Sequence, residues 1–151
     1  MTVTVKEKKK KTLKAVLSYV PSDREIANKL LGILAGRGDL EVAAVSVDEN
    51  ADSAEKLSKE LRTSDIFVII LSPDSRRNEW IIAEIYAAWG VCKGIVPIKT
   101  APEISLPVAV GGLLMFDLED VLNNESWDRI LSQFKSARDS QFHFLTSNPI
   151  R

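Results

Sequence analysis

The stretch IFVIIL, residues 66–71, is an uninterrupted apolar run in which most residues are β-branched or aromatic. Such a run is typical of a strand whose two faces are both covered, as in a parallel sheet between two layers of helices. The segment that follows, Ser72–Asn78, is polar and contains Pro73, so the strand should end at Leu71. We therefore expect residues 66–71 to form the central, fully buried strand of a sheet.

Strand-like and helix-like segments alternate on both sides of this run. The further expected strands are residues 13–19, 40–47, 95–98 and 113–118. The expected helices start at a capping box formed by Ser22 and Glu25, near Asp52 with Glu55, near Glu79, and at a cap within Asn123–Ser126. This alternation predicts a flavodoxin-like, doubly wound α/β fold with five parallel strands in the order 2-1-3-4-5 and helices on both faces.

Length and charge indicate one domain with a basic tail. The chain has 151 residues, 45% of them hydrophobic and 27% charged, which is enough for a real core. Residues 1–14 carry a local charge of +5 and the remainder −6. We expect a flexible basic tail over residues 1–12, the domain over 13–139, and a frayed C-terminal extension over 140–151. An acidic domain disfavours nucleic-acid binding.

The rare residues exclude several chemistries. Cys92 is the single cysteine and His143 the single histidine, so an internal disulfide, a thiolate cluster and a two-histidine metal site are all impossible. We see no signal peptide and no apolar stretch long enough to span a membrane. The expectation is a soluble, cytoplasmic protein without a metal.

Two loops are singled out by the fold alone. In open parallel sheets ligands bind beyond the carboxyl ends of the strands, where the winding direction switches, here between the first and third strands. This rule points to Ser18–Asp23 and Ser72–Asn78. A Gly-rich dinucleotide or P-loop motif is missing, and a phospho-acceptor receiver would need carboxylates where Ser18 and Ser72 stand.

Glu84 is the anomaly of the sequence. Apart from Glu84, all residues of the segment Trp80–Val91 (WIIAEIYAAWGV) are apolar or glycine. Such a helix is expected to be buried, and a carboxylate is rarely buried without a partner. Trp80 precedes Glu84 by one helical turn, and a carboxylate beside an aromatic plate can bind a sugar and a flat ring. Alternatively, Glu84 pairs with a lysine or arginine, or reaches the surface at a helix edge.

Three motifs together resemble the TIR domain (Toll/interleukin-1 receptor/resistance domain), in its bacterial and archaeal form, from about Leu13 to Phe134. The first is a strand ending in Ser18-Tyr19 with an acid, Asp23, four residues later. The second is the buried strand closed by Ser72. The third is the Trp-x-x-x-Glu pattern of Trp80 and Glu84.

The resemblance implies an activity. In TIR enzymes this glutamate serves cleavage of the nicotinamide–ribose bond of NAD, which would make Glu84 catalytic. Ser18, Tyr19, Asp23, Ser72 and Trp80 would then line the substrate pocket. NAD would be the substrate, no cofactor would be needed, and the product would serve immune, antiviral or stress signalling as an NAD hydrolase or ADP-ribosyl cyclase. Homotypic TIR–TIR association and a separate effector or sensor protein are the implied partners.

The chain also departs from the family pattern. Ile81 stands where a cysteine is frequent, Asn78 where a serine is frequent, and the loop Asp48–Asp52 has neither the proline nor the glycine of many members. That loop commonly shapes the NAD pocket and TIR–TIR contacts. Two alternatives therefore stay open: a non-catalytic TIR interaction module, and an enzyme like the nucleoside deoxyribosyltransferases.

Overall fold

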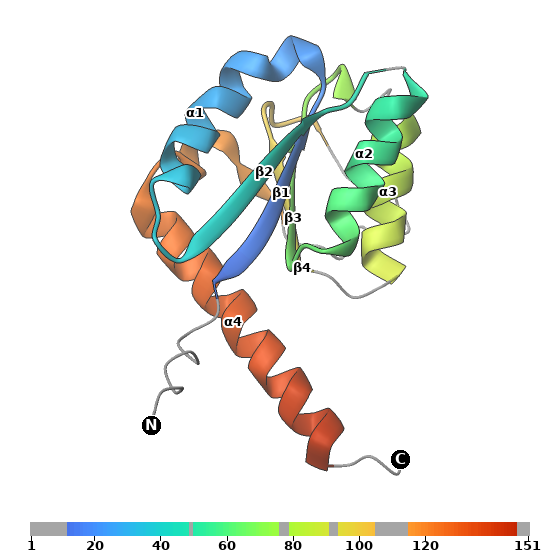
Figure 1. Cartoon of the computed structure of the whole chain (residues 1–151). Helices are drawn as coiled ribbons and strands as arrows, with labels where there is room; N and C mark the ends of the chain where they lie inside the picture. The colour runs from blue at the N-terminus through green and yellow to red at the C-terminus, as the bar shows by residue number, and fades with distance from the viewer. Residues whose placement is uncertain (1–11, 49, 76–78, 91–93, 105–114, 148–151) are drawn as a thin grey trace, which may run out of the picture.

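The computed structural model describes residues 12–48, 50–75, 79–90, 94–104 and 115–147. They form one five-stranded sheet with helices on both faces (Figure 1). The strands are β1 (Leu13–Tyr19), β2 (Leu40–Ser46), β3 (Ile66–Leu71), β4 (Gly94–Lys99) and β5 (Phe116–Asp117). The α-helices are α1 (Arg24–Ala35), α2 (Ala51–Arg62), α3 (Glu79–Gly90) and α4 (Asn124–Ser147), and short 3-10 helices cover Pro21–Asp23 and Leu118–Val121.

The strand order is β2-β1-β3-β4-β5 and every pairing is parallel. β3 lies in the middle, and all six of its residues are buried. The predicted flavodoxin-like α/β fold and its central strand are thereby confirmed. The expected tail over residues 1–12 falls almost wholly outside the described residues, which begin at Thr12.

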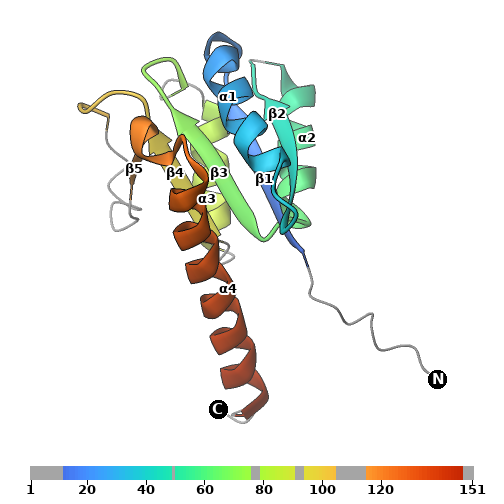
Figure 2. The same cartoon turned by 90° about the vertical axis from the view of Figure 1, so that its left-hand side faces the viewer.

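Two hydrophobic cores fill the space between the sheet and its helices. Leu17 and Val68 face α1 and α4, and Val16 and Phe67 face α2 and α3. Figure 2 shows α4 along one face of the sheet and α3 behind the other. The continuous apolar run of β3 is explained by this arrangement, because both of its faces are covered.

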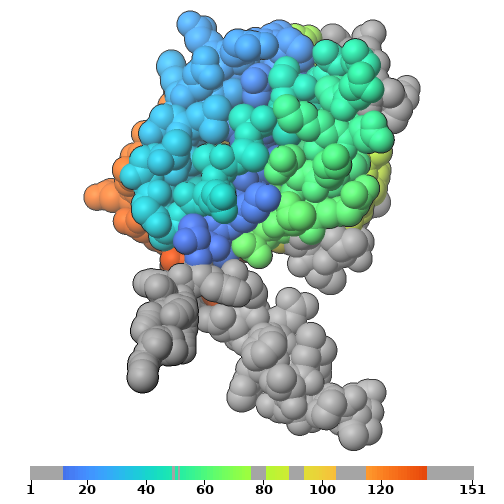
Figure 3. Space-filling model, in the orientation of Figure 1, coloured from blue at the N-terminus to red at the C-terminus, as the bar shows by residue number. Residues whose placement is uncertain are grey.

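β2 is an edge strand, and its outer side reaches the surface. In Figure 3 its atoms lie between those of α1 and α2. Only Leu40 and Val45 of this strand are buried. Its first residue pairs with Leu13 and its last, Ser46, with Tyr19, so the two strands end together at the same edge of the sheet.

Hydrogen bonds from Arg37 connect α4 to the turn before β2. The Arg37 guanidinium donates to both carboxylate oxygens of Asp39, at 3.0 and 3.1 Å, and to Asp128 Oδ1 at 2.6 Å. It also donates to the Asn124 side chain at the start of α4. The hydrogen bonds that Asp39 accepts from Arg37 hold the pKa of its carboxyl below the usual range.

Several element boundaries differ from the sequence prediction. The fifth strand is expected over residues 113–118. Among the described residues it covers only Phe116–Asp117 (β5), and Leu118 already begins a 3-10 helix. α4 continues to Ser147, past the expected domain end at residue 139. α2 is capped by Asn50, whose side chain accepts from the Asp52 amide, and not by Asp52.

The predicted capping box of Ser22 and Glu25 is also not formed. The cap position of α1 is Asp23, and no side chain bonds to the helix there. The Ser22 hydroxyl donates instead to Asp74 Oδ2 of the loop after β3, at 2.8 Å. Ser22 thus bonds a residue distant in sequence and does not cap the helix.

Candidate functional site

Two serine–aspartate hydrogen bonds join the loops that follow β1 and β3. Ser72 donates to Asp23 Oδ2 at 2.5 Å, and Ser22 donates to Asp74 Oδ2 at 2.8 Å. The donor comes from the β3 loop in the first bond and from the β1 loop in the second. The two segments predicted from the switch-point rule therefore do meet, and they are bonded to each other.

Ser75, which the sequence analysis did not single out, fixes the shape of the β3 loop. Its hydroxyl accepts from the Ser72 amide at 2.8 Å, and its own amide donates to Ser72 Oγ at 3.2 Å. Ser72 and Ser75 are both buried. This reciprocal turn leaves the Ser72 hydroxyl oriented to donate to Asp23, so the carboxylate is held by a rigid partner.

Asp23 is a buried carboxylate with an acidic neighbour. Its side chain is 8% exposed, and burial raises its pKa above the ordinary value, a rise that the Ser72 hydrogen bond opposes and the charge of Asp74 adds to. Ionisation of Asp23 therefore lowers the stability of the fold. Such a cost is common where a carboxylate is kept for a purpose other than stability.

We expect Asp23→Asn to stabilise the fold in a pH-dependent way. The pKa of Asp23 is higher in the folded protein than its unfolded value of 3.8. The fold is therefore most stable below pH 3.8, where Asp23 is protonated, and it loses stability as the pH rises through the folded pKa and the side chain ionises. The asparagine keeps an acceptor for Ser72 without the charge. The melting temperature of the variant should match wild type near pH 4 and exceed it at pH 7.

Asp48→Asn is the matched control, because the sign there is reversed. Hydrogen bonds from the Asn50 amide and the Ser53 hydroxyl lower the pKa of the Asp48 carboxyl. Ionised Asp48 therefore stabilises the fold above its unfolded pKa, and this stabilisation is lost as the pH falls through the folded pKa. Asp48→Asn should for that reason be less stable than wild type at pH 7. Thermal melts from pH 4 to 7 check both variants, and equal profiles for the two would contradict the assignment.

Ser18 and Tyr19 end β1 on opposite faces of the sheet. Ser18 is fully buried on the face of Val16, toward α2 and α3, and its hydroxyl has no hydrogen-bond partner among the described residues. Tyr19 is 8% exposed and belongs to the core on the α1 side. Of these two predicted residues, only Ser18 therefore faces the helix that carries Glu84.

Glu84 lies at the seam between α2 and α3. It is half-buried, and its Oε2 accepts a 2.5 Å hydrogen bond from the Ser58 hydroxyl of α2. No ion pair to Glu84 is present in the part of the chain that the structure describes. Of the alternatives that the sequence left open, the position at a helix edge matches this geometry, and among the described residues no lysine or arginine pairs with Glu84.

α3 is not buried all round, which corrects the expectation from its composition. Ile81, Ile85 and Ala88 face the sheet, but Ala83 and Ala87 are exposed and Tyr86 is 43% exposed. No described element covers this outer face. An apolar composition shows that water contact is unfavourable, but it does not show that a neighbour is present within the same chain.

The predicted site residues thus fall into separate groups. Asp23 and Ser72 are bonded to each other, Ser18 lies buried in the sheet, and no hydrogen bond links Glu84 to any of them within the described residues. Trp80 lies in the first turn of α3, and its side chain is outside the described ones. Ser58 and Ser75 were not among the predicted residues: no motif marks Ser58, whereas the Ser-x-x-Ser spacing after the strand indicates Ser75.

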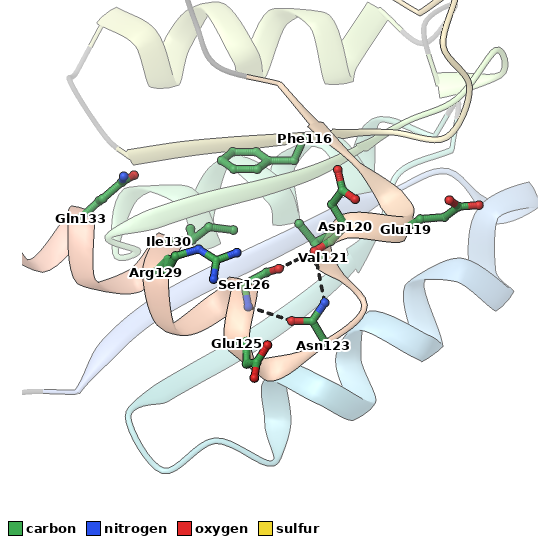
Figure 4. A pocket seen from close by; sticks show the side chains of 10 residues that line it. All are labelled: Phe116, Glu119, Asp120, Val121, Asn123, Glu125, Ser126, Arg129, Ile130 and Gln133. Atoms are coloured by element: carbon green, nitrogen blue, oxygen red, sulfur yellow. Dashed lines mark hydrogen bonds between the residues drawn. The ribbon is translucent and has the colours of Figure 1, made fainter.

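A separate hollow of about 510 Å³ lies where β5 meets α4 (Figure 4). Phe116 and Ile130 provide apolar walls, and Glu119, Asp120 and Arg129 lie around it. It shares no residue with the predicted site. The Ser126 hydroxyl donates to the Asp120 carbonyl, and the Ser126 amide donates to Asn123 Oδ1 at 2.8 Å, so part of its rim is the cap of α4.

Comparison with known proteins agrees with the fold and its motifs. The family model described as "TIR domain" matches residues 16–132, and the chain belongs to this family. A similar solved structure is the TIR domain of the Toll-related receptor TRR-2 from the lower metazoan Hydra magnipapillata, crystal form I. It is 20% identical with a TM-score of 0.58, and the match covers 80% of this chain and 97% of that one. None of the curated proteins matches the chain.

None of the described helices is long and apolar enough to cross a bilayer. Within the same residues, no group of three or more histidine, cysteine, aspartate or glutamate side chains is placed to hold a metal ion.

Proposed function

We propose that this TIR domain cleaves the nicotinamide–ribose bond of NAD, as an NAD hydrolase or an ADP-ribosyl cyclase, with Glu84 as the catalytic residue. The observation that carries the proposal is the state of Glu84. It is a half-buried carboxylate in an apolar helix, no described cation neutralises it, and a hydroxyl holds it in place. A carboxylate held in this way, with no described cation beside it, is available to a ligand.

The chemistry suits a single carboxylate. Nicotinamide leaves the ribose of NAD as a neutral molecule from a cationic ring, so the departure needs no strong general acid. As the bond breaks, positive charge develops on the ribose, as in glycosidase transition states. A fixed carboxylate stabilises that charge, and it can also accept hydrogen bonds from the ribose hydroxyls.

The Ser18 hydroxyl, which has no hydrogen-bond partner among the described residues, supports a ligand site on the same side of the sheet. A buried hydroxyl without a partner costs about 1–3 kcal/mol. Ser18 faces the α2 and α3 layer, where Glu84 lies. In the proposed site Trp80 contacts the substrate near Glu84, Ser18 lies beneath the site at the end of β1, and Asp23 and Ser72 shape the neighbouring crevice. The position of Tyr19 gives it a supporting role in the core.

A non-catalytic TIR interaction module is the second candidate. The exposed apolar face of α3, with Tyr86 43% exposed, is the observation that favours it. Such a face fits assembly with other TIR domains or with a separate effector or sensor protein. We place either activity in the cytoplasm, in immune or stress signalling. The two candidates agree on assembly and differ on whether NAD is consumed.

Assembly provides the test. We expect the specific rate of nicotinamide release to rise when the protein is concentrated or clustered, because an assembled neighbour can complete a site that one chain leaves open. The measurement is nicotinamide by chromatography across a wide range of protein densities, with NAD in excess. A flat, non-zero specific activity would show that the site is complete in one chain. Clustering without any nicotinamide would favour the interaction module.

A further inference from the structure

The contact between Ser58 and Glu84 has the features of a positioning interaction. It joins two helices, α2 and α3, which pack side by side on one face of the sheet. The Ser58 hydroxyl donates to Glu84 Oε2 at an oxygen–oxygen distance of 2.5 Å. The two residues are 26 positions apart, so neither belongs to a local turn or cap.

The packing of the two helices explains why these side chains meet. Leu57 and Leu61 bury one side of α2, and Ile81 and Ile85 bury one side of α3. Ser58 follows Leu57 and Glu84 precedes Ile85, and each step of one residue turns about 100° around the helix. Both side chains therefore leave the core and lie along the seam, where both are half-buried.

The donor is a neutral hydroxyl, and this matters for the chemistry. A lysine or arginine at position 58 would hold the carboxylate equally well, but it would also neutralise the charge that a developing cation needs. Serine fixes the rotamer of Glu84 through Oε2 alone. Among the described residues none bonds Oε1, which leaves one oxygen for a ligand.

We propose that Ser58 is a positioning residue for Glu84, acting through the carboxylate and not on the substrate; this inference rests on the proposed function. Ser58 orders the glutamate before the substrate arrives, so that less ordering is needed in the transition state. A merely structural role would be different: the bond would then link α2 to α3, and its loss would affect stability without affecting turnover.

The test compares Ser58→Ala, Ser58→Thr and Ser126→Ala. Ser126 is the matched control, because it is also a half-buried helical serine whose hydroxyl donates a hydrogen bond, to the Asp120 carbonyl, but its helix α4 packs on the other face of the sheet. Nicotinamide release from NAD by the clustered chain gives kcat and KM, and thermal melting gives stability.

We expect Ser58→Ala to lower kcat and kcat/KM together by roughly 10-fold, the rate equivalent of one ordinary hydrogen bond, with little change in KM. Ser58→Thr, which keeps the hydroxyl, should restore most of the rate, and Ser126→Ala should leave it unchanged. In a Glu84→Gln background, Ser58→Ala should cost no further activity, because it acts through that side chain.

Wild-type turnover by Ser58→Ala would overturn the inference, and so would an equal loss in Ser126→Ala or no rescue by threonine. If Ser58→Ala is fully active while Glu84→Gln is inactive, the role of Ser58 fails and the proposed function stands. If the clustered wild-type chain releases no nicotinamide, or if Glu84→Gln turns over normally, the proposed function fails and the inference fails with it.

Discussion

Replacing Glu84 by glutamine is expected to lower NAD turnover by roughly 10²- to 10³-fold. This is the usual cost of losing one electrostatic contact to the transition state, on the order of 3–4 kcal/mol in the barrier. Glutamine keeps the shape of the side chain and an acceptor oxygen for the Ser58 hydroxyl. What it removes is the negative charge, so turnover should fall while the fold persists.

The thermal melt separates this expectation from a structural role. The melting temperature of Glu84→Gln should stay within a few degrees of wild type, because no described ion pair is broken. A buried ion pair that lost one partner would instead cost about 3–5 kcal/mol. Glu55→Gln is the control, since Glu55 is exposed on α2, and it should change neither turnover nor melting. A collapsed melt for Glu84→Gln would make the residue structural.

Trp127→Ala should produce the largest loss of stability, about 3–5 kcal/mol. Trp127 is fully buried between α4 and the sheet, and its Nε1 donates to the Val121 carbonyl at 2.7 Å. The substitution opens a cavity and leaves that carbonyl without its donor. Urea denaturation followed by circular dichroism gives the free energy of unfolding directly.

Two controls accompany this variant. Trp127→Phe keeps most of the apolar volume and loses the hydrogen bond, so it should cost roughly 1–2 kcal/mol. Gln133→Ala changes an exposed residue of the same helix and should stay within about 0.5 kcal/mol of wild type. A loss below about 1 kcal/mol for Trp127→Ala would mean that α4 contributes little to the core.

The fold could be predicted because its strongest signals are local. The continuous apolar run of β3 and the alternation of strand-like and helix-like segments determine a doubly wound sheet almost alone. The order of the strands then brings the loops after β1 and β3 together. The contact of Asp23 with Ser72 follows from that topology, although no residue near either one in sequence indicates it.

The details that could not be predicted depend on which distant group each side chain meets. Ser22 has the pattern of a helix cap, yet Asp74 accepts its hydrogen bond. The sequence of α3 suggests burial on all sides, but Tyr86 is exposed because no described element packs there. The bond of Ser58 to Glu84 depends on how two helices pack, which neither helix encodes by itself.

The measurement that tests the central claim most directly is product stoichiometry from NAD for the clustered wild-type chain beside Glu84→Gln. Mass spectrometry would follow nicotinamide together with ADP-ribose and its cyclic forms. The proposal predicts that nicotinamide and the ADP-ribose products accumulate one to one with wild type, and roughly 10²-fold or more slowly with the variant. Intact NAD after incubation with the clustered wild-type chain, or equal rates for the two proteins, would contradict it.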